Sequence, residues 1–262
     1  MKPVTLITGA SSGIGAELAR VFAAHGHELV LVARRESELA ALADAIAATG
    51  TPRPTVLAAD LSLHEAVARI AGELNARGLE VANLVNNAGY GLAGASATLD
   101  RDDQLAMIDL NVRALTELSL SFTDSLARHR GGILNVASIA GFLPGPGMAV
   151  YYASKAFVLS FSEALYAELK PRGIRVTALC PGPVSTGFQA RAGLKAGGVG
   201  DGGPLALPAR RVAEIGYDGL VAGKRVVVAG LGNRLAVFFM GFMPHGLLLP
   251  IVASSMRRAA RF

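Results

Sequence analysis

The chain has 262 residues, of which 52% are hydrophobic and 17% are charged, so it can bury a substantial core and is not a low-complexity disordered chain. Its formal net charge is +5 at pH 7, but lysine and arginine are scattered, with no basic run interleaved with aromatic residues. The single cysteine, Cys180, rules out an internal disulfide framework, and neither it nor the five histidines shows metal-ligand spacing. We therefore expect neither nucleic-acid binding nor a metal site.

Short apolar runs alternate with longer segments of helical period, a pattern typical of repeated strand–helix units around a parallel sheet. The runs predict strands at residues 4–8, 28–33, 55–59, 83–86, 132–137, 175–180 and 225–229. The segments between them predict helices at residues 13–24, 37–48, 63–77, 102–127, 150–170 and 208–222. The sequence thus predicts an α/β fold in a single domain, residues 1–232. We expect a doubly wound, Rossmann-type parallel sheet of about seven strands with helices on both faces.

A glycine-rich turn follows the first predicted strand and precedes the first predicted helix. It reads Thr8-Gly9-Ala10-Ser11-Ser12-Gly13-Ile14-Gly15, with the spacing G-x-x-x-G-x-G. Glycines permit positive φ and close approach of the backbone to a ligand, and a helix that begins here points its free N–H groups at an anion. A plain tight turn is the alternative. The position between a strand and a helix favours a binding site for the pyrophosphate of a dinucleotide.

The end of the second predicted strand indicates which dinucleotide fits. NAD-binding sites hold the ribose 2′-hydroxyl with an acidic residue there, whereas this chain reads Val32-Ala33-Arg34-Arg35. An arginine pairs with a 2′-phosphate, which a carboxylate would repel. Arg34 and Arg35 as solvated residues at a strand end are the alternative. The missing acid favours NADP(H) as the cofactor.

Further motifs follow the later strands in order. They are Asp60-Leu61 after the third strand, Asn86-Asn87-Ala88-Gly89 after the fourth, Asn111 in a helix, Ser138 after the fifth strand, Tyr151 and Lys155 in the next helix, and Pro181-Gly182-Pro183-Val184-Ser185-Thr186 after the sixth strand. Together with the glycine turn they resemble the short-chain dehydrogenase/reductase family in its NADP-preferring form, over residues 4–229. The resemblance implies an oxidoreductase that transfers a hydride between NADP(H) and a carbonyl/alcohol pair.

The spacing of Tyr151 and Lys155 has a chemical reason of its own. Four residues apart on a helix, the two side chains share one face. A phenol of pKa about 10 is a poor acid–base group at neutral pH, and a nearby ammonium group lowers that pKa. Tyr152 is the alternative phenol, but only Tyr151 has Lys155 four residues on. Ser138, at the end of the adjoining strand, can donate a hydrogen bond to the same substrate oxygen.

The resemblance also implies residue roles. Tyr151 is the acid–base group, Lys155 also holds the nicotinamide ribose, Ser138 orients the substrate, and Asn111 supports a water that relays protons to Lys155. Taken alone, Ser138 would be a turn residue and Asn111 a helix asparagine bonded to backbone. The cofactor-binding residues implied are Gly9, Ser11, Ser12, Gly13, Ile14, Gly15, Arg34, Arg35, Asp60, Leu61, Asn87, Ala88, Gly89, Tyr151, Lys155, Pro181, Gly182, Val184 and Thr186. A non-catalytic NADPH sensor is the alternative, and it would not need the three catalytic side chains together.

Two regions break the strand–helix rhythm. Residues 185–207 are rich in glycine and predict a mobile loop over the substrate, because the family places its substrate pocket there. This loop supplies apolar surface, which favours a bulky apolar ketone or alcohol, and two charges; its residues are Phe188, Leu194, Val199 and Leu205, with Arg191 and Lys195.

The second region is a C-terminal extension, residues 233–262, with 22 uncharged residues between Arg234 and Arg257. We expect two short helices broken near Pro244 that pack on the domain or on a partner subunit. Docking on a membrane surface through Arg257, Arg258 and Arg261, and a membrane span, are the alternatives. No cleavable apolar leader precedes the first motif, so we expect a cytoplasmic protein, membrane-associated if the extension docks. By the resemblance it is a homo-oligomer acting on a small molecule.

Overall fold

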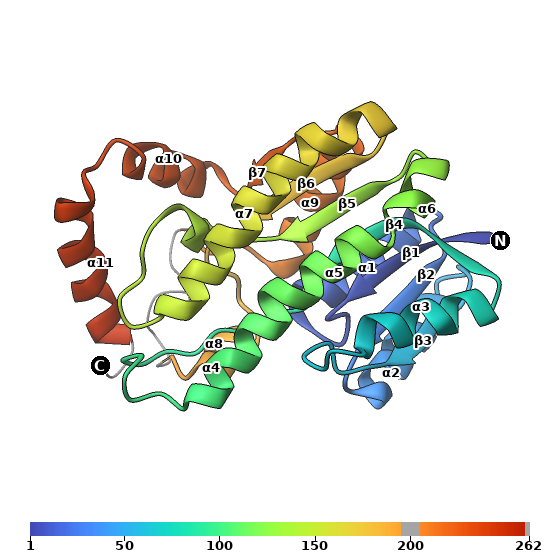
Figure 1. Ribbon diagram of the computed structural model, residues 1–262, viewed down its shortest axis with the longest axis horizontal. Helices are drawn as coiled ribbons and strands as arrows, with labels where there is room; N and C mark the ends of the chain where they lie inside the picture. The colour runs from blue at the N-terminus through green and yellow to red at the C-terminus, as the bar shows by residue number, and fades with distance from the viewer. Residues whose placement is uncertain (195–204, 260–262) are drawn as a thin grey trace.

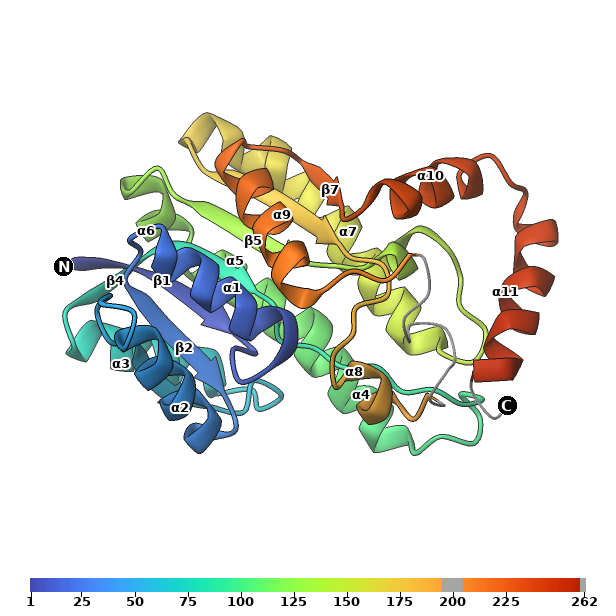
Figure 2. The ribbon, with the colours of Figure 1, turned by 180° about the vertical axis from the view of Figure 1, so that it is seen from behind.

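A computed structural model describes residues 1–194 and 205–259, and its centre is a seven-stranded parallel sheet in the order β3-β2-β1-β4-β5-β6-β7 (Figures 1 and 2). The strands are β1 (Lys2–Thr8), β2 (Leu29–Ala33), β3 (Thr55–Ala58), β4 (Leu79–Asn86), β5 (Gly132–Val136), β6 (Arg175–Cys180) and β7 (Val226–Val228). The strand order reverses beside β1, which pairs with both β2 and β4. This confirms the predicted doubly wound fold, and a ligand crevice is expected at the carboxyl ends of the strands there.

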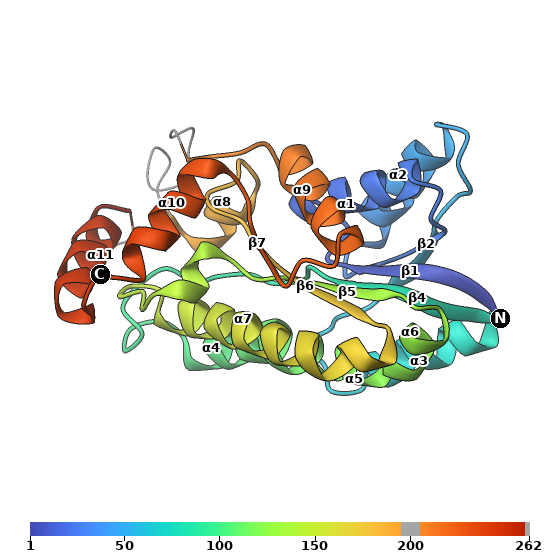
Figure 3. The same cartoon turned by 90° about the horizontal axis from the view of Figure 1, so that it is seen from above.

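Helices cover both faces of the sheet (Figure 3). One face carries α1 (Gly13–Ala24), α2 (Glu36–Ala47) and α9 (Ala209–Val221). The other carries α3 (Ala66–Ala76), α4 (Arg101–Ile108), α5 (Leu115–Ser121), α6 (Thr123–Arg128) and α7 (Ala149–Leu169). The 3-10 turns η2 (Ile139–Phe142) and η3 (Lys170–Arg172) flank α7.

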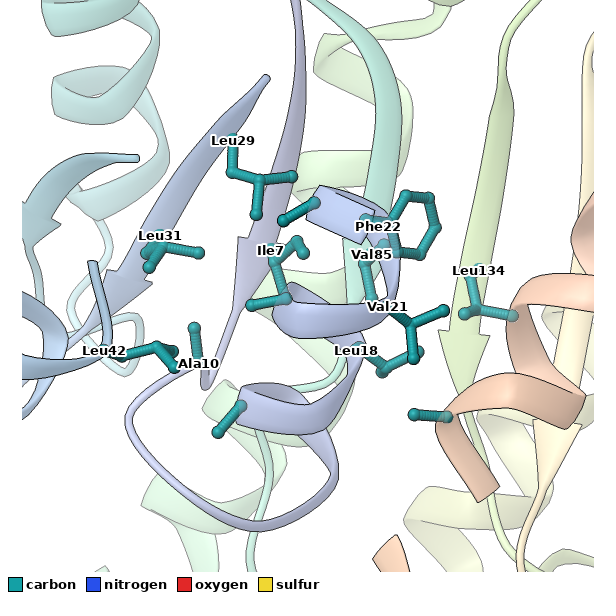
Figure 4. Packing of buried hydrophobic residues seen from close by; sticks show 14 of the residues in the cluster. Ile7, Ala10, Leu18, Val21, Phe22, Leu29, Leu31, Leu42, Val85 and Leu134 are labelled. Atoms are coloured by element: carbon teal, nitrogen blue, oxygen red, sulfur yellow. The ribbon is translucent and has the colours of Figure 1, made fainter. Parts of the chain in front are cut away.

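The two faces are filled by alternate residues of the same strands. Ile7 belongs to the cluster under α1, α2 and α9, where it lies with Val85 and Phe22 (Figure 4). Its neighbour Leu6 belongs to the cluster under α3, α5, α6 and α7. Successive side chains of a strand point to opposite faces, so a strand covered on both faces must be apolar throughout. This is why the strands appear in the sequence as uninterrupted apolar runs.

Two element predictions were wrong. The helix predicted over residues 102–127 is interrupted by a π-helical turn, η1 (Asp109–Ala114), and by a break at Phe122 between α5 and α6. Ser119 and Thr123 donate their hydroxyls to backbone carbonyls there, competing with the helical pattern. Strand β4 begins at Leu79, four residues before the prediction, because polar Glu80 and Asn83 conceal a strand that pairs with β1 from its start.

The loop and the C-terminal extension contain further helices. In the loop, α8 (Phe188–Ala192) is a short helix that the sequence did not predict, while Lys195 and Val199 lie outside the described residues. The extension forms α10 (Leu231–Met240) and α11 (His245–Ala259), which flank Pro244 as expected, although Pro250 lies inside α11. Arg261 also lies outside the described residues. Within those residues, no helix combines the length and apolar character that crossing a bilayer requires.

Candidate active site

A cleft of about 700 Å³ opens at the carboxyl ends of the strands. Its walls include sequence-predicted residues from the whole length of the chain: Gly9, Ser11, Ser12, Gly13, Ile14, Arg34, Arg35, Asp60, Leu61, Asn87, Ala88, Gly89, Ser138, Tyr151, Lys155, Pro181, Gly182, Val184 and Thr186. Of the predicted catalytic and cofactor-binding residues, two do not line it. Gly15 packs behind the turn, and Asn111 is fully buried behind the wall. Within the described residues, no cluster of His, Cys, Asp and Glu could hold a metal ion.

The glycine turn has the backbone geometry that its composition predicts. Gly9 and Gly13 have φ values of +65° and +58°, in the left-handed region that side chains disfavour. A Cβ added to Gly15 would lie 2.3 Å from the carbonyl oxygen of Gly9. The turn is therefore too tight for side chains at these positions, and it leaves the N-terminus of α1 open to the cleft.

Thr8 locks this turn to the segment that follows β4. Its hydroxyl oxygen accepts hydrogen bonds from the backbone N–H groups of Asn87 (3.0 Å) and Ala88 (3.1 Å). The side-chain amide of Asn87 donates to the carbonyl oxygens of Thr8 (2.9 Å) and Gly9 (3.2 Å). The sequence pointed to Asn87 and Ala88 but missed Thr8, whose signal was its position at the end of β1.

Three charged groups, Arg34, Arg35 and Asp60, line the cleft beside the glycine turn. Arg35 donates to the hydroxyl of Ser11 (3.1 Å), and the guanidinium of Arg34 lies 3.9 Å from a carboxylate oxygen of Asp60. Burial acts to raise the pKa of Asp60, but hydrogen bonds from Ser62 and the charge of Arg34 outweigh it, so this pKa lies below its usual value. Because Asp60 stays ionised, it partly neutralises Arg34, while Arg35 lies 3.9 Å from a carboxylate oxygen of Glu38.

Arg191 does not lie where the sequence suggested. The sequence placed it among the charges of the substrate pocket, whereas its guanidinium donates to the hydroxyl of Ser12 (3.1 Å) at the glycine turn. The distance of 179 residues between the two partners explains why no sequence pattern indicated this contact.

Tyr151 lies near the first turn of α7 and faces the cleft. Burial raises the pKa of its phenol to about 12, and a hydrogen bond with the Ser138 side chain opposes the rise. Ser138 follows β5, and its hydroxyl oxygen accepts from the N–H of Ala140 (3.1 Å). Its own hydrogen can be donated to the Tyr151 phenol or, over a long contact of 3.5 Å, to the carbonyl oxygen of Pro181. That hydroxyl can therefore turn to a ligand oxygen at little cost.

Lys155 lies one helical turn after Tyr151, and it is buried with 6% of its surface exposed. Its ammonium group donates to the carbonyl oxygen of Val136 (2.8 Å) and lies 5.9 Å from the centre of the Tyr151 ring. Burial lowers the pKa of Lys155 to about 8. The expected lowering of the Tyr151 pKa by this ammonium is not seen, because burial of the phenol dominates and the ammonium is bonded to the backbone instead.

Asn111 lies in the π-helical turn behind Lys155. Its side-chain oxygen accepts from the N–H of Tyr90 (3.1 Å), and its amide donates to the carbonyl oxygen of Tyr90 (2.9 Å) and to the hydroxyl of Ser154 (3.0 Å). A Cβ added to Gly89 would lie 2.9 Å from the Asn111 oxygen and 3.5 Å from the Lys155 nitrogen. The asparagine thus fixes the segment that separates it from Lys155, and π-turns of this kind recur at functional sites.

The turn after β6 is held by a residue that the sequence missed. Asn233 is 1% exposed and donates to the carbonyl oxygens of Ala229 (2.8 Å) and Leu205 (3.0 Å). A Cβ on Gly182 would lie 2.4 Å from its side-chain amide, so only glycine fits opposite it. The first residues of α10 therefore position the turn that covers one end of the cleft.

The far end of the cleft is apolar, and most of its residues come from unpredicted places. Met148, Met240 and Met256 line it, the last two from α10 and α11. Phe188 and Leu194 line it as predicted, and the Phe188 ring lies 5.3 Å from that of Tyr151, whereas Leu205 does not reach it. Methionines adapt to irregular apolar shapes, so this end is suited to a flexible or bulky ligand.

Comparisons with known proteins agree with this geometry. A family model for short chain dehydrogenases matches residues 3–196, well over half of the chain. The chain is similar to sulfoacetaldehyde reductase 2 of Chromohalobacter salexigens, with 39% identity over 191 residues that cover 72% of this chain and 75% of the relative.

Three solved structures have the same fold, and two of them are complexes with a nicotinamide dinucleotide. A short-chain dehydrogenase from Sphingobium yanoikuyae in complex with NADPH is 34% identical, with a TM-score of 0.80 over 94% of this chain and 95% of that one. A short-chain dehydrogenase/reductase from Burkholderia phymatum in complex with NAD is 27% identical, with a TM-score of 0.79 over 90% and 92%. A bulky-bulky ketone specific alcohol dehydrogenase from Comamonas testosteroni is 29% identical, with a TM-score of 0.75 over 93% and 95%.

Proposed function

The chain belongs to the short-chain dehydrogenase family of oxidoreductases, and we propose that it transfers a hydride between NADP(H) and the carbonyl/alcohol pair of a bulky, apolar substrate. One observation carries the proposal. Ser138, Tyr151 and Lys155 line the same cleft as the glycine turn, so a proton donor and a dinucleotide site share one space. A dinucleotide-binding protein without chemistry has no use for this set.

The residues of the glycine turn fit the phosphates of a dinucleotide. The open N-terminus of α1 offers backbone N–H groups and the positive end of a helix dipole, and Ser11 and Ser12 add hydroxyl donors. The tight packing of Gly9 against Asn87 lets the backbone itself form the wall. When bound, the reduced cofactor supplies the hydride that adds to the carbonyl carbon.

Tyr151 supplies the proton for the carbonyl oxygen. With its pKa raised to about 12, the phenol is protonated at neutral pH and is ready to donate in the direction of reduction. The hydroxyl of Ser138 is the second donor to the same oxygen, and together the two hydroxyls stabilise the negative charge that develops there. In the reverse direction Tyr151 first gives up its own proton through Lys155, and its phenolate then accepts the proton of the alcohol.

Lys155 replaces the proton that Tyr151 loses. Its pKa of about 8 places proton exchange near physiological pH, which an exposed lysine would not do. Asn111 is a positioning residue, because it fixes the Gly89 backbone against Lys155 through its bonds to Tyr90. A water held beside this pair would complete the relay to solvent.

Two arginines support the choice of NADP(H) as the cofactor, and the apolar end of the cleft supports a bulky substrate. Arg34 and Arg35 stand at the end of β2, where an acidic residue would be needed for the ribose of NAD, and this favours NADP(H). The similar structures include complexes with both dinucleotides, so we rest the preference on these residues. The methionine-lined far end supports a bulky ketone, as does the similarity to the bulky-bulky ketone specific alcohol dehydrogenase of Comamonas testosteroni.

Replacement of one hydroxyl group tests the chemistry. We expect Tyr151→Phe to lower kcat for ketone reduction by about 10³-fold, within the range for loss of an acid–base group, with little change in the affinity for NADPH. Tyr152→Phe is the matched control, since it removes the neighbouring phenol and should keep most of the rate. The measurement is NADPH absorbance over a panel of apolar ketones. Equal rates for parent and Tyr151→Phe would refute the mechanism, and no turnover across the panel would favour an NADPH sensor.

We further propose that this cytoplasmic homo-oligomer touches anionic membrane surfaces through its C-terminal extension. Phe238, Phe239 and Phe242 are 58%, 64% and 74% exposed, and residues 219–262 contain no aspartate or glutamate. Exposed aromatics beside arginines are typical of interfacial helices. We expect co-sedimentation with vesicles containing phosphatidylserine and none after Phe238→Ser with Phe239→Ser. Equal co-sedimentation of the parent and the variant with the vesicles would refute the membrane contact. The oligomeric state is a separate question, which analytical ultracentrifugation at sedimentation equilibrium answers.

A further inference from the structure

Two guanidinium groups from distant segments of the chain donate hydrogen bonds to the glycine turn. Arg35, after β2, donates to the hydroxyl of Ser11, and Arg191, from α8, donates to the hydroxyl of Ser12, each at 3.1 Å. Arg191 also donates to the carbonyl oxygen of Gly187, at the start of its own helix. Both arginines line the cleft beside the glycine turn.

The charge around Ser12 is positive in the part of the chain that the structure describes. Ser12 is the N-cap of α1, its side chain makes no capping hydrogen bond, and the first turn of that helix has no acidic residue. Among the ion pairs of residues 1–194 and 205–259, none includes Arg191. A cation thus faces the positive end of a helix dipole, an arrangement that is unfavourable by itself and that a bound anion would stabilise.

Packing fixes the segment that carries Arg191 over the turn. A Cβ added to Gly13 would lie 3.3 Å from a methyl carbon of Thr186, just before α8. Gln189 donates to the carbonyl oxygen of Val184 (2.8 Å), and the carbonyl oxygen of Ala192 accepts from the N–H of Ala93 (2.8 Å). Both ends of α8 are therefore held, and the exposed side chain of Arg191 starts from a fixed backbone beside the turn.

We propose that Arg191 binds the pyrophosphate of the dinucleotide, so that the substrate loop itself completes the cofactor site. This inference rests on the proposed function. It divides the arginines of the cleft by the phosphate that they contact: Arg191 takes the pyrophosphate that NADPH and NADH share, and Arg34 and Arg35 take the 2′-phosphate that only NADPH carries. Removal of the Arg191 guanidinium should then weaken the binding of any ligand with a pyrophosphate, whether or not the ligand has a 2′-phosphate.

Titration calorimetry with three ligands tests this division. NADPH carries both groups, ADP-ribose carries only the pyrophosphate, and adenosine 2′-monophosphate carries only the 2′-phosphate. We expect Arg191→Gln to lower the affinity for NADPH and for ADP-ribose about tenfold, as loss of a charge-assisted hydrogen bond does. The affinity for adenosine 2′-monophosphate should not change. Arg35→Gln should lower the affinity for NADPH and for adenosine 2′-monophosphate and leave the affinity for ADP-ribose unchanged. Arg211→Gln, an exposed arginine outside the cleft, is the matched control.

The outcomes separate the inference from the function on which it rests. If the parent binds none of the three ligands, the proposed function fails. If the parent binds them and Arg191→Gln binds ADP-ribose equally well, only the role of Arg191 fails. Weaker binding of adenosine 2′-monophosphate by Arg191→Gln would also overturn it, because the arginine would then contact the other phosphate. An unchanged unfolding temperature shows that the variant is folded, and Arg191→Lys should restore part of the ADP-ribose affinity.

Discussion

The two ends of the cleft are built on different principles. At the cofactor end, the wall is backbone: Gly9, Gly13 and Gly15 leave no room for side chains, and Thr8 and Asn87 bond the turn in place. At the substrate end, the wall is made of methionine and aromatic side chains from segments nearly 110 residues apart in sequence. The first end has one permitted shape, whereas the second can change its lining while the sheet stays the same.

The largest effect is expected from one methyl group added at the cofactor end, which tests whether the wall there is rigid. Gly15→Ala places a Cβ 2.3 Å from the Gly9 carbonyl oxygen, so the turn must shift. We expect NADPH affinity to fall about 10²-fold, the cost of a misplacement near 1 Å, and stability to fall by about 1–3 kcal/mol. Gly72→Ala, in α3 with open space around it, is the control and should be neutral or slightly stabilising. Equal NADPH binding by Gly15→Ala would show that the turn is not rigid.

Lys155 lies between the two ends of the cleft. Burial of its ammonium group lowers the free energy of unfolding of the protein. A pKa lowered from 10.5 to about 8 corresponds to about 3 kcal/mol against the charged form, with the ammonium bonded to the carbonyl oxygen of Val136. Lys155→Met should therefore be about 3 kcal/mol more stable than the parent at pH 7, and we expect it to be inactive. Denaturant unfolding of the cofactor-free proteins measures this difference.

The sign of the pH dependence follows from the direction of that shift. Between pH 8 and 10.5 the unfolded parent holds the Lys155 proton more tightly than the folded parent does, so the stability of the parent rises with pH across this window. The advantage of Lys155→Met should shrink accordingly and be nearly gone at pH 10.5. The exposed Lys224→Met is the control and should show no such trend. A constant advantage from pH 7 to 10.5 would contradict the lowered pKa.

The smallest expected effect is at the substrate end. Met256, 4% exposed on α11, lines the cleft, and Met256→Ala removes about 1 kcal/mol of apolar contact with a bulky ketone. The KM for that ketone should rise about fivefold, while the Kd for NADPH stays the same. Ile251→Ala, at a position 58% exposed on the same helix, should change neither. Equal ketone kinetics for Met256→Ala would place the substrate elsewhere.

The same contrast explains what could be predicted from the sequence. The strands and the glycine turn are contiguous segments with strict local requirements, and Tyr151 and Lys155 are set by helical spacing, so local patterns indicated them. Arg191 and Met256 enter the cleft only through tertiary packing, which leaves no local pattern. The π-turn at Asn111 was hidden for the same reason, since its bonds to Tyr90 and Ser154 form only in the folded chain. The division at residue 232 stays a prediction, as α10 begins at Leu231.

Asn233 joins the start of α10 to the turn beside Gly182 and to Leu205, yet α10 and α11 beyond it contribute only two of the three methionines at the apolar end. Substitutions after that point can accumulate without disturbing the strands or the nucleotide turn. The C-terminal helices are therefore the part of the chain in which descendants of one ancestor, or an engineer exchanging segments between homologues, can acquire a new substrate at the least risk to folding.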